Sequence, residues 1–333
     1  MSGFADVEKW RFGANFIPST AVNQLEMWQE ESFDPVTIRR ELFWGASLGM
    51  RVMRVYLHDL LHQQDAPGFL RRIERYLAIA GEFDIRTVFV FFDDCWKDEF
   101  SLGKQPEPVK CGHNSGWVQS PGHRVADDPA QWGRLEAYVT EVMRHFAHDR
   151  RVLAWDLYNE PGNGVSGDHE HRSGCRGKES LPLLEAVFAW AKAARAEQPY
   201  TVGLWNLAPE FDELNRAALA QSQVVSFHCY NPPEGLAERI DFLRYLAEGR
   251  PLMCTEYMAR RRGSTFAGCL PLLKAKKVTA IHWGLVAGKT NTIYPWGWQA
   301  ADGEPEEWFH DVFHTDGRML YEEEREVFAQ VVQ

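Results

Sequence analysis

Short runs of apolar residues recur along the chain, separated by longer stretches in which apolar residues are spaced as in helices. Eight such runs lie at residues 10–18, 50–58, 85–92, 151–159, 200–205, 223–231, 250–258 and 278–286. They are nearly continuous in apolar residues rather than alternating, as parallel strands buried on both faces require. The pattern predicts eight buried, parallel strands.

The stretches between these runs carry helix signals. Asp34 and Pro35 suit the N-cap and first position of a helix over residues 34–48. Helix-like segments also cover residues 68–83, 132–147 and 181–197. Alternating strands and helices indicate a parallel sheet, and eight units predict an α/β fold, a closed (β/α)₈ TIM barrel. An open, doubly wound sheet is the alternative, although no GxGxxG motif follows the first strand.

The chain is expected to form one domain over residues 1–333, because no shift in composition marks a linker. Three long βα loops are predicted at residues 93–131, 160–180 and 287–311. Loops of this length in a compact domain are usually functional or disordered. These contain several tryptophans, which favours a role as walls of a binding cleft: Trp96, Trp117, Trp296, Trp298 and Trp308.

Polar and aromatic side chains gather at one end of the predicted strands. In a TIM barrel the C-terminal ends of the strands carry the active site, whereas a purely structural role would not place so many polar groups there. The residues at or near these ends are Asn15, His58, Asp93, Asp94, Asn159, Glu160, His228, Tyr230, Glu256 and Trp283.

Composition excludes some partners. The 333 residues are 45% hydrophobic and 25% charged, which is ordinary for a soluble globular protein. The net charge of −11 argues against a nucleic-acid or anionic-membrane partner, because no basic field is available. No apolar run approaches the roughly 20 residues that span a membrane. Most of the thirteen tryptophans are expected to pack in the core, but their flat faces also suit sugar rings.

The cysteines and the N-terminal segment suggest a cytoplasmic protein. None of the six cysteines forms a CxxC pair, so we expect reduced thiols, while a disulfide among Cys95, Cys111 and Cys175 stays open. The segment "MSGFADVEKW" has neither the basic nor the apolar region of a signal peptide.

Two of the strand-end residues are carboxylic acids that can act as a pair. Glu160 ends the fourth predicted strand and Glu256 ends the seventh, so they face each other across the mouth of a barrel. Two such acids can cleave a glycosidic bond, with retention of configuration when the carboxyl groups lie about 5–5.5 Å apart and inversion at a wider spacing. A lone strand-end glutamate is more often an ion-pair partner, and only the pair favours catalysis.

The ordered set of motifs over about residues 10–315 resembles a clan A glycoside hydrolase, nearest to the cellulase-like branch of family 5. The matching residues are Arg54 in "VMRVYL", Asn159 and Glu160 in "LYNEP", His228 and Tyr230 in "SFHCYN", Glu256 in "LMCTEYM" and Trp283 in "IHWG". The resemblance implies a TIM-barrel enzyme that needs no cofactor or metal. It implies retaining cleavage of β-linked glucans, mannans or xylans, or of the corresponding oligosaccharides, so a carbohydrate is the expected partner.

The resemblance also implies a role for each matching residue. Glu160 would be the general acid/base and Glu256 the nucleophile. Arg54 would hold Glu256 ionised, and Tyr230 could donate a hydrogen bond to the same carboxylate. Asn159 would bind the sugar hydroxyl next to the anomeric carbon.

For His228 and Trp283 the residues themselves leave two interpretations open. His228 would hydrogen-bond Tyr230 or the acid/base in the family, but it could be a structural histidine at a strand end. Trp283 would form the stacking floor under the cleaved sugar, but it could serve core packing alone.

The sequence departs from the family after the third strand. Many family members carry a histidine pair there, whereas this chain has Asp93 and Asp94. His58 and Asp59, or His113 and Asn114 in the long loop after the third strand, are candidates for the replacement sugar contacts. The predicted site residues of this region are His58, Asp93, His113 and Asn114. The loop "HNSGWVQSPG", residues 113–122, could cap the cleft and favour attack at chain ends.

Two rival functions remain. A metal-dependent barrel hydrolase could draw ligands from His58, Asp59, His62, Asp93, Asp94, His113 and His228, but no HExxH motif occurs and the first strand lacks an HxH pair. A non-catalytic sugar-binding barrel is the other rival, although both carboxylates are present. A serine esterase is disfavoured, because the GxSxG match at residues 45–49 lies at the end of the helix predicted over residues 34–48 and not on a strand-to-helix turn.

Overall fold

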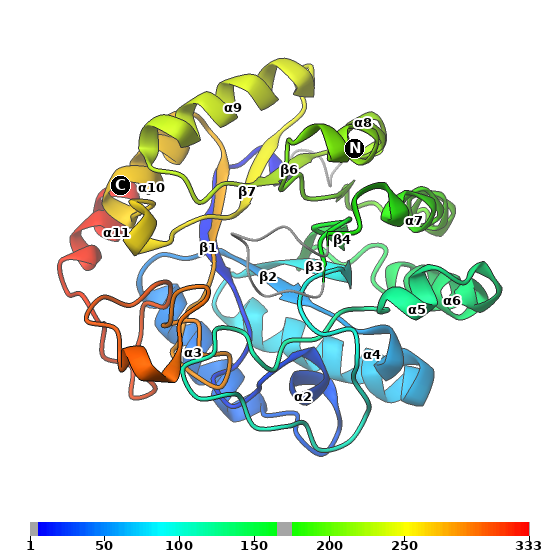
Figure 1. Ribbon diagram of the computed structural model, residues 1–333, viewed down its shortest axis with the longest axis horizontal. Helices are drawn as coiled ribbons and strands as arrows, with labels where there is room; N and C mark the ends of the chain where they lie inside the picture. Colours follow the sequence, from blue (N-terminus) through cyan, green and yellow to red (C-terminus); the bar gives the residue numbers. More distant parts are fainter. Residues whose placement is uncertain (1–5, 165–174, 333) are drawn as a thin grey trace.

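The computed structural model describes residues 6–164 and 175–332 and contains a closed barrel of eight parallel strands (Figure 1). Their order in the sheet is β5-β4-β3-β2-β1-β8-β7-β6. The strands are β1 (Phe12–Asn15), β2 (Val52–Tyr56), β3 (Arg86–Asp93), β4 (Val152–Asn159), β5 (Tyr200–Thr201), β6 (Val225–His228), β7 (Leu252–Glu256) and β8 (Thr279–His282). The predicted (β/α)₈ barrel and all eight strand positions are confirmed.

The barrel closes between the fifth and sixth strands through a short bridge. Strand β5 has two residues instead of the predicted 200–205, and Leu204 alone pairs with Phe227 in parallel beyond it. The Leu204 amide donates to the Ser226 carbonyl at 3.0 Å, and the His228 amide donates to the Leu204 carbonyl at 2.9 Å. These bonds continue the sheet around the ring after β5 ends.

Helices surround the strands, as Figure 1 shows. They are α2 (Gln24–Trp28), α3 (Pro35–Ser47), α4 (Asp59–Glu82), α5 (His123–Ala126), α6 (Trp132–His145), α7 (Leu181–Ala194), α8 (Asp212–Gln221), α9 (Pro233–Ala247), α10 (Phe266–Ala275) and α11 (Glu324–Val332). Short 3₁₀ turns lie at Pro129–Gln131, Gly177–Ser180, Pro209–Phe211, Arg260–Arg262 and Ala300–Asp302. No helix of the described residues is both long and apolar enough to cross a membrane.

The helix start expected at residue 34 is confirmed in detail. The Asp34 carboxylate accepts hydrogen bonds from the amides of Val36 and Thr37, and Pro35 occupies the first helical position. An aspartate in this position satisfies amides that have no partner within the helix.

An apolar layer fills the barrel interior at the N-terminal ends of the strands. Because the inward side chains of several strands meet in this layer, they close the barrel at its N-terminal end. Arg54 and Asp156 lie on the same inward faces, two residues beyond Val52 and Ala154. The functional cleft can therefore open only at the C-terminal ends. The layer consists of Val7, Val52, Val88, Leu153, Ala154, Val224, Met253 and Ile281.

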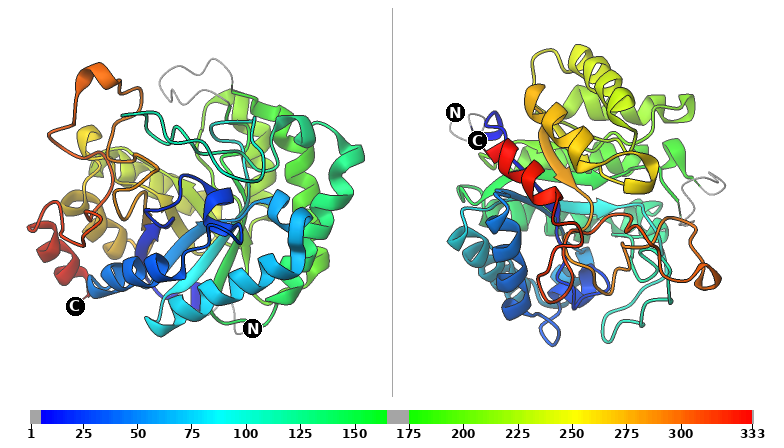
Figure 2. Two further views of the ribbon diagram at one scale, coloured as in Figure 1. Left: turned by 90° about the horizontal axis from the view of Figure 1, so that it is seen from below. Right: turned by 90° about the vertical axis from the view of Figure 1, so that its left-hand side faces the viewer.

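Two of the predicted long loops project from this end of the barrel and join each other. In Figure 2, left, the loop near residues 100–120 (teal) and the loop near residues 285–310 (orange) rise from the same side. The Asn114 amide donates to the Thr290 carbonyl at 2.8 Å, and Asn291 Nδ2 donates to the Val109 carbonyl at 2.9 Å. The remaining predicted loop, 160–180, lies partly outside the described residues, which resume at 175.

The described chain contains no disulfide between any two of Cys95, Cys111 and Cys175. Cys95 and Cys111 are buried and Cys175 is half-buried.

Candidate active site

A cavity of about 480 Å³ opens at the C-terminal ends of the strands. A volume of this size falls within the range of small-molecule and sugar sites. Nine of the eleven predicted site residues line it: Asp93, His113, Asn114, Asn159, Glu160, His228, Tyr230, Glu256 and Trp283. Arg54 lies directly beneath the cavity, where it bonds Asn159 and Glu256. His58 lies outside it.

The sheet register brings these side chains to one level. Asp93 pairs with Asn159 across β3 and β4, and His228 pairs with Glu256 across β6 and β7. Because parallel strands end together, the side chains that follow or finish them converge on the mouth of the barrel.

Glu160 turns the chain out of β4 into the cavity. Its backbone adopts φ +44°, a left-handed conformation that costs a residue with a side chain about 1 kcal/mol or more. Asp94 stabilises the turn that follows, because its Oδ2 accepts from the Gly162 amide at 2.8 Å and from Ser180 Oγ at 2.5 Å. Asp94 Oδ1 accepts from Tyr158 at 2.6 Å. Asp94 thus anchors the segment that carries Glu160.

The Glu160 carboxyl group is buried but well supplied with hydrogen bonds. His228 Nδ1 lies 2.6 Å from Oε1, while Asn163 Nδ2 and Cys95 Sγ donate to Oε2 at 2.6 and 3.1 Å. Of the two family roles considered for His228, the contact with Glu160 is present. These partners explain how a buried strand can end in a carboxylic acid.

The Glu256 carboxyl group receives donors on both oxygens. Oε1 accepts from Arg54 Nη1 at 3.0 Å and from the Tyr56 hydroxyl at 3.1 Å, and Oε2 accepts from the Tyr230 hydroxyl at 2.8 Å. Burial raises the pKa of Tyr230 well above its usual value, and the Glu256 and Glu160 carboxylates raise it further. Tyr230 therefore keeps its proton and donates a hydrogen bond to Glu256.

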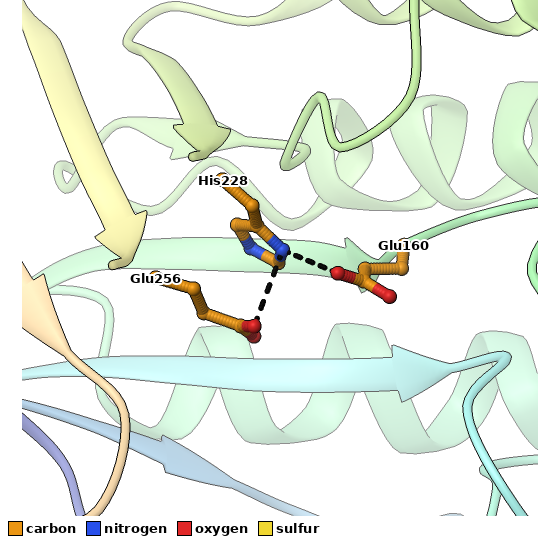
Figure 3. Close-up of side chains that lie close together, drawn as sticks. All are labelled: Glu160, His228 and Glu256. Carbon is orange, nitrogen blue, oxygen red and sulfur yellow. Dashed lines mark hydrogen bonds and ion pairs between the residues drawn. The ribbon is translucent and has the colours of Figure 1, made fainter. Parts of the chain in front are cut away.

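The two carboxyl groups approach each other around His228 (Figure 3). His228 Nδ1 lies 2.6 Å from Glu160 Oε1 and 3.4 Å from Glu256 Oε2. One oxygen of each carboxyl group and one ring nitrogen lie within 4.8 Å of one another. Both glutamates line the cavity and are 5% and 6% exposed, so each can meet a ligand between them.

A buried network beneath the cavity orients Arg54. Its Nε donates to Asp156 Oδ2 at 2.9 Å, and its Nη2 donates to Asn159 Oδ1 at 2.7 Å. Asn15 Oδ1 accepts from Nη1 at 2.9 Å, and its own amide is held by the carbonyls of Thr255 and His282. The guanidinium is fully buried, and its N–H donors have acceptors, so its direction toward Glu256 is fixed.

Asp93 supports the site from β3. Its Oδ1 accepts from Asn159 Nδ2 and from the Cys95 amide, both at 2.9 Å, and its Oδ2 accepts from Trp117 Nε1 at 2.8 Å. Burial raises the pKa of Asp93 to about 7, and these hydrogen bonds oppose the rise. Asp93 thus lines the cavity and also holds the amide of Asn159.

Aromatic rings form the walls of the cavity. Trp283 is 9% exposed and meets the edges of Tyr56 and Trp117, with ring centroids 5.9 and 5.6 Å apart. Trp283 therefore packs in a ring cluster and also presents part of its surface to the cavity. Trp96 and Trp296 line the cavity from two of the long loops, and Trp205 lines it beyond β5.

His113 and Asn114 reach the cavity from the loop after β3, but His58 does not. His113 Nδ1 bonds the Tyr294 carbonyl at 2.7 Å, and its ring stacks on Trp96 at 5.6 Å. His58 is fully buried, and its Nδ1 accepts from the Leu60 amide as the N-cap of α4. The structure thus gives His58 a helix-capping position.

Sequence reasoning missed four residues that hydrogen-bond Glu160, Glu256 or Arg54: Tyr56, Cys95, Asp156 and Asn163. Tyr56 and Asp156 carried a signal, because each lies an even number of residues from an inward-facing position of the same strand. Cys95 and Asn163 lie in turns after β3 and β4, where no periodic pattern indicates the direction of a side chain.

The ligands suggested for a metal centre do not converge. His62 pairs with Glu141 at 2.8 Å, and Asp59 pairs with Arg134. Within residues 6–164 and 175–332, the cluster with metal-ligating spacing is Glu160, His228 and Glu256. Arg54 already supplies a cation to this cluster at 3.0 Å, which favours hydrogen-bonded carboxylates there.

No family model and no curated protein matches the chain in sequence. Solved structures nevertheless match it in fold. A GH5_18 protein from Streptomyces cattleya, in complex with Manb1-4GlcNAc, is 15% identical with a TM-score of 0.66 and covers 97% of this chain and 80% of its own. An endo-beta-1,4-mannanase from Thermotoga petrophila is 14% identical, with a TM-score of 0.60 and coverage of 98% and 76%.

An exo-beta-1,4-mannosidase from Opitutaceae bacterium strain TAV5 is also similar. It is 17% identical with a TM-score of 0.63, and the match covers 97% of this chain and 59% of that one. At these identities the likeness establishes a shared barrel. The resemblance to the family 5 glycoside hydrolases is therefore confirmed for the fold.

Proposed function

We propose that the protein is a retaining glycoside hydrolase that cleaves β-linked oligosaccharides, with Glu160 as the acid/base and Glu256 as the nucleophile. The observation that carries this proposal is the opposed pair of carboxyl groups in the cavity, with one oxygen of each within 4.8 Å. Retaining enzymes place their two carboxyl groups about 5–5.5 Å apart, whereas inverting enzymes leave about 6.5–9.5 Å for a water molecule.

The surroundings of Glu256 suit a nucleophile. Arg54 contributes a positive charge, and the hydroxyl groups of Tyr56 and Tyr230 donate to the carboxylate. These partners hold in place the carboxylate that, in this proposal, attacks the anomeric carbon. The attack forms a covalent glycosyl ester and releases the leaving group.

The surroundings of Glu160 suit an acid/base. In the first step Glu160 gives its proton to the leaving oxygen, and in the second it takes a proton from the water that hydrolyses the ester. Hydrogen bonds from Asn163 and Cys95, and the contact with His228, hold the carboxyl group in place through both steps.

Asn159 has capacity left for a sugar. Its Oδ1 accepts a single hydrogen bond among the described residues, from Arg54, so one lone pair remains for a hydroxyl group next to the anomeric carbon. The exposed part of Trp283 offers an apolar surface to the sugar ring.

We further propose a manno-configured sugar at the cleaved position, ahead of the gluco and xylo alternatives. The names of the three similar structures support this choice, because they refer to a Manb1-4GlcNAc complex, a mannanase and a mannosidase. A cavity of about 480 Å³, lined by His113, Asn114 and Trp117 from the loop after β3, favours short oligosaccharides or chain ends.

The test is hydrolysis of aryl β-glycosides and β-1,4-linked oligosaccharides of the manno, gluco and xylo series, followed by proton NMR. We expect fastest turnover in the manno series, with the β-anomer formed first. Glu256→Gln should abolish turnover, whereas Glu185→Gln, on the exposed face of α7, should not change it. Initial α-anomer would contradict retention, and sugar binding without turnover would support the non-catalytic barrel.

A further inference from the structure

We propose that Cys95 is a positioning residue for Glu160: its thiol donates a hydrogen bond to Oε2 of the acid/base and favours the ionised form of that carboxyl group. This inference deepens the proposed function and rests on it for its catalytic meaning. The contact itself, Cys95 Sγ to Glu160 Oε2 at 3.1 Å, is a property of the folded protein.

The hydrogen bonds around the sulfur determine which way the thiol proton points. Asn159 Nδ2 and Asn163 Nδ2 each lie 3.4 Å from Cys95 Sγ and can only donate to it. The sulfur therefore accepts from two amides, and its single proton is left for an acceptor. Glu160 Oε2 is that acceptor, because a carboxylate is the strongest acceptor within reach.

The backbone of Cys95 is fixed in the same arrangement. Its amide donates to Asp93 Oδ1 at 2.9 Å, and Asp93 also binds Trp117 Nε1 and Asn159 Nδ2. The Cys95 side chain is 6% exposed and lines the cavity beside Glu160. Because hydrogen bonds hold both the backbone and the side chain of Cys95, its weak thiol donor keeps a constant direction toward Glu160.

The thiol stays protonated under ordinary conditions. Burial raises the pKa of Cys95 well above its usual value, and the negative charge of Glu160 raises it further. Cys95 is therefore a hydrogen-bond donor to Glu160, rather than a thiolate that would repel it.

The consequence is a lower pKa for Glu160 than the same buried site would give without the thiol. A hydrogen bond of ordinary strength corresponds to a shift of about half a unit to one unit. Cys95→Ala removes the donor, so the Glu160 pKa and the basic limb of the kcat/KM profile should both rise by that amount. Cys95→Ser keeps a hydroxyl donor and should stay closer to the wild-type values.

The experiment measures the Glu160 pKa directly, by carbon-13 NMR titration of glutamate carboxyl groups, with Glu160→Gln to assign the signal. Wild type, Cys95→Ala and Cys95→Ser are compared, and Cys269→Ala serves as a control, because that buried thiol lies outside the cavity lining. Should Cys95→Ala fail to fold, Cys95→Val removes the donor and keeps the side-chain volume.

A raised Glu160 pKa in the donor-free variant, restored by serine, supports the inference. An unchanged pKa overturns it, as does an equal rise in Cys269→Ala. Because the titration needs no turnover, a raised pKa in a protein that hydrolyses no glycoside would support the contact and contradict the proposed function.

Discussion

Arg54 Nη1 lies 3.0 Å from Glu256 Oε1, with the guanidinium fully buried. The same guanidinium lies 2.8 Å from Asp156 Oδ2, so one cation serves two carboxyl groups. Hydroxyl donors from Tyr56 and Tyr230 supplement the charge at Glu256. These three donors hold the Glu256 carboxyl group in a fixed direction, which suits its proposed role as the nucleophile.

Replacing Arg54 should damage both activity and stability. Arg54→Lys loses the planar guanidinium group, whose N–H donors reach Asp156, Asn159 and Glu256 together. We therefore expect kcat/KM to fall by about 100-fold or more. Arg54→Met leaves buried carboxylates without a cation and should cost about 3–5 kcal/mol of unfolding free energy. Urea unfolding and steady-state kinetics measure these effects.

The matched control for Arg54 is Arg39, whose guanidinium bonds both oxygens of Glu82 at 2.9 Å on the surface. Both of these side chains are exposed, so Arg39→Lys should change the unfolding free energy by no more than about 0.5 kcal/mol. Equal effects at Arg54 and Arg39 would show that burial of the Arg54 network has no energetic importance.

The Tyr56 hydroxyl can be tested without disturbing its ring. Tyr56→Phe removes the donor to Glu256 Oε1 but keeps the ring contacts with Trp117 and Trp283. We expect a fall of about 10-fold to 100-fold in kcat with little change in KM, because a donor to the nucleophile is lost. Tyr138→Phe, in the packing between β3 and α6, is the control and should retain full activity.

Loss of Glu160 should depend on the leaving group. Glu160→Ala removes the proton donor, and general acid catalysis contributes about 10²–10⁴-fold. We expect kcat/KM to fall by that factor for oligosaccharides but by much less for dinitrophenyl glycosides, whose leaving group needs no proton. A loss that is equal for both substrates would contradict the acid/base assignment of Glu160.

The raised pKa of Asp93 predicts a pH dependence of stability. Its folded-state pKa is about 7 against an unfolded value near 4, so the native state binds the extra proton between these limits. The contribution of Asp93 to the free energy of unfolding is therefore complete below about pH 4 and is lost as the pH rises to about 7. Over this range the free energy of unfolding falls by up to about 1.4 kcal/mol per pH unit.

Asp93→Asn removes this titration and should flatten the dependence of unfolding free energy on pH between about 4 and 7. Glu41, whose pKa burial also raises to about 7, should leave a residual slope of the same sign. Urea unfolding at a series of pH values measures both slopes. A slope in Asp93→Asn equal to that of wild type would mean that Asp93 is ionised throughout.

Much of the fold could be predicted because the strands of this barrel are buried on both faces and read as continuous apolar runs. The fifth strand was predicted too long, because regular pairing stops after Thr201 and only Leu204 pairs with the neighbouring strand β6 beyond it. At Gly203 an added Cβ would lie 3.1 Å from His228 Nε2, so a residue remote in sequence shapes the chain there. Such contacts leave no local pattern.

The site was predictable where it follows strand geometry and not where it depends on turns. Glu160, Glu256 and Arg54 follow from their strands, whereas the path of the chain from Cys95 to Trp117 depends on loop hydrogen bonds. His58 shows the opposite case: a polar residue at a strand end was interpreted as a sugar contact, but it begins the next helix directly. Strand ends and helix starts coincide in short βα connections, so residue type alone does not separate the two roles.

The most direct test of the account is the mass of the intact protein after incubation with activated 2-fluoro sugars of the manno, gluco and xylo series. A retaining enzyme accumulates a glycosyl ester, because the fluorine slows its hydrolysis more than its formation when the leaving group is good. We predict a mass increase of one fluoro-sugar, fastest in the manno series, with the modified peptide carrying the sugar on Glu256. Attachment at another residue, or measurable hydrolysis without any adduct from the three series, would contradict the assignment of Glu256 as the nucleophile.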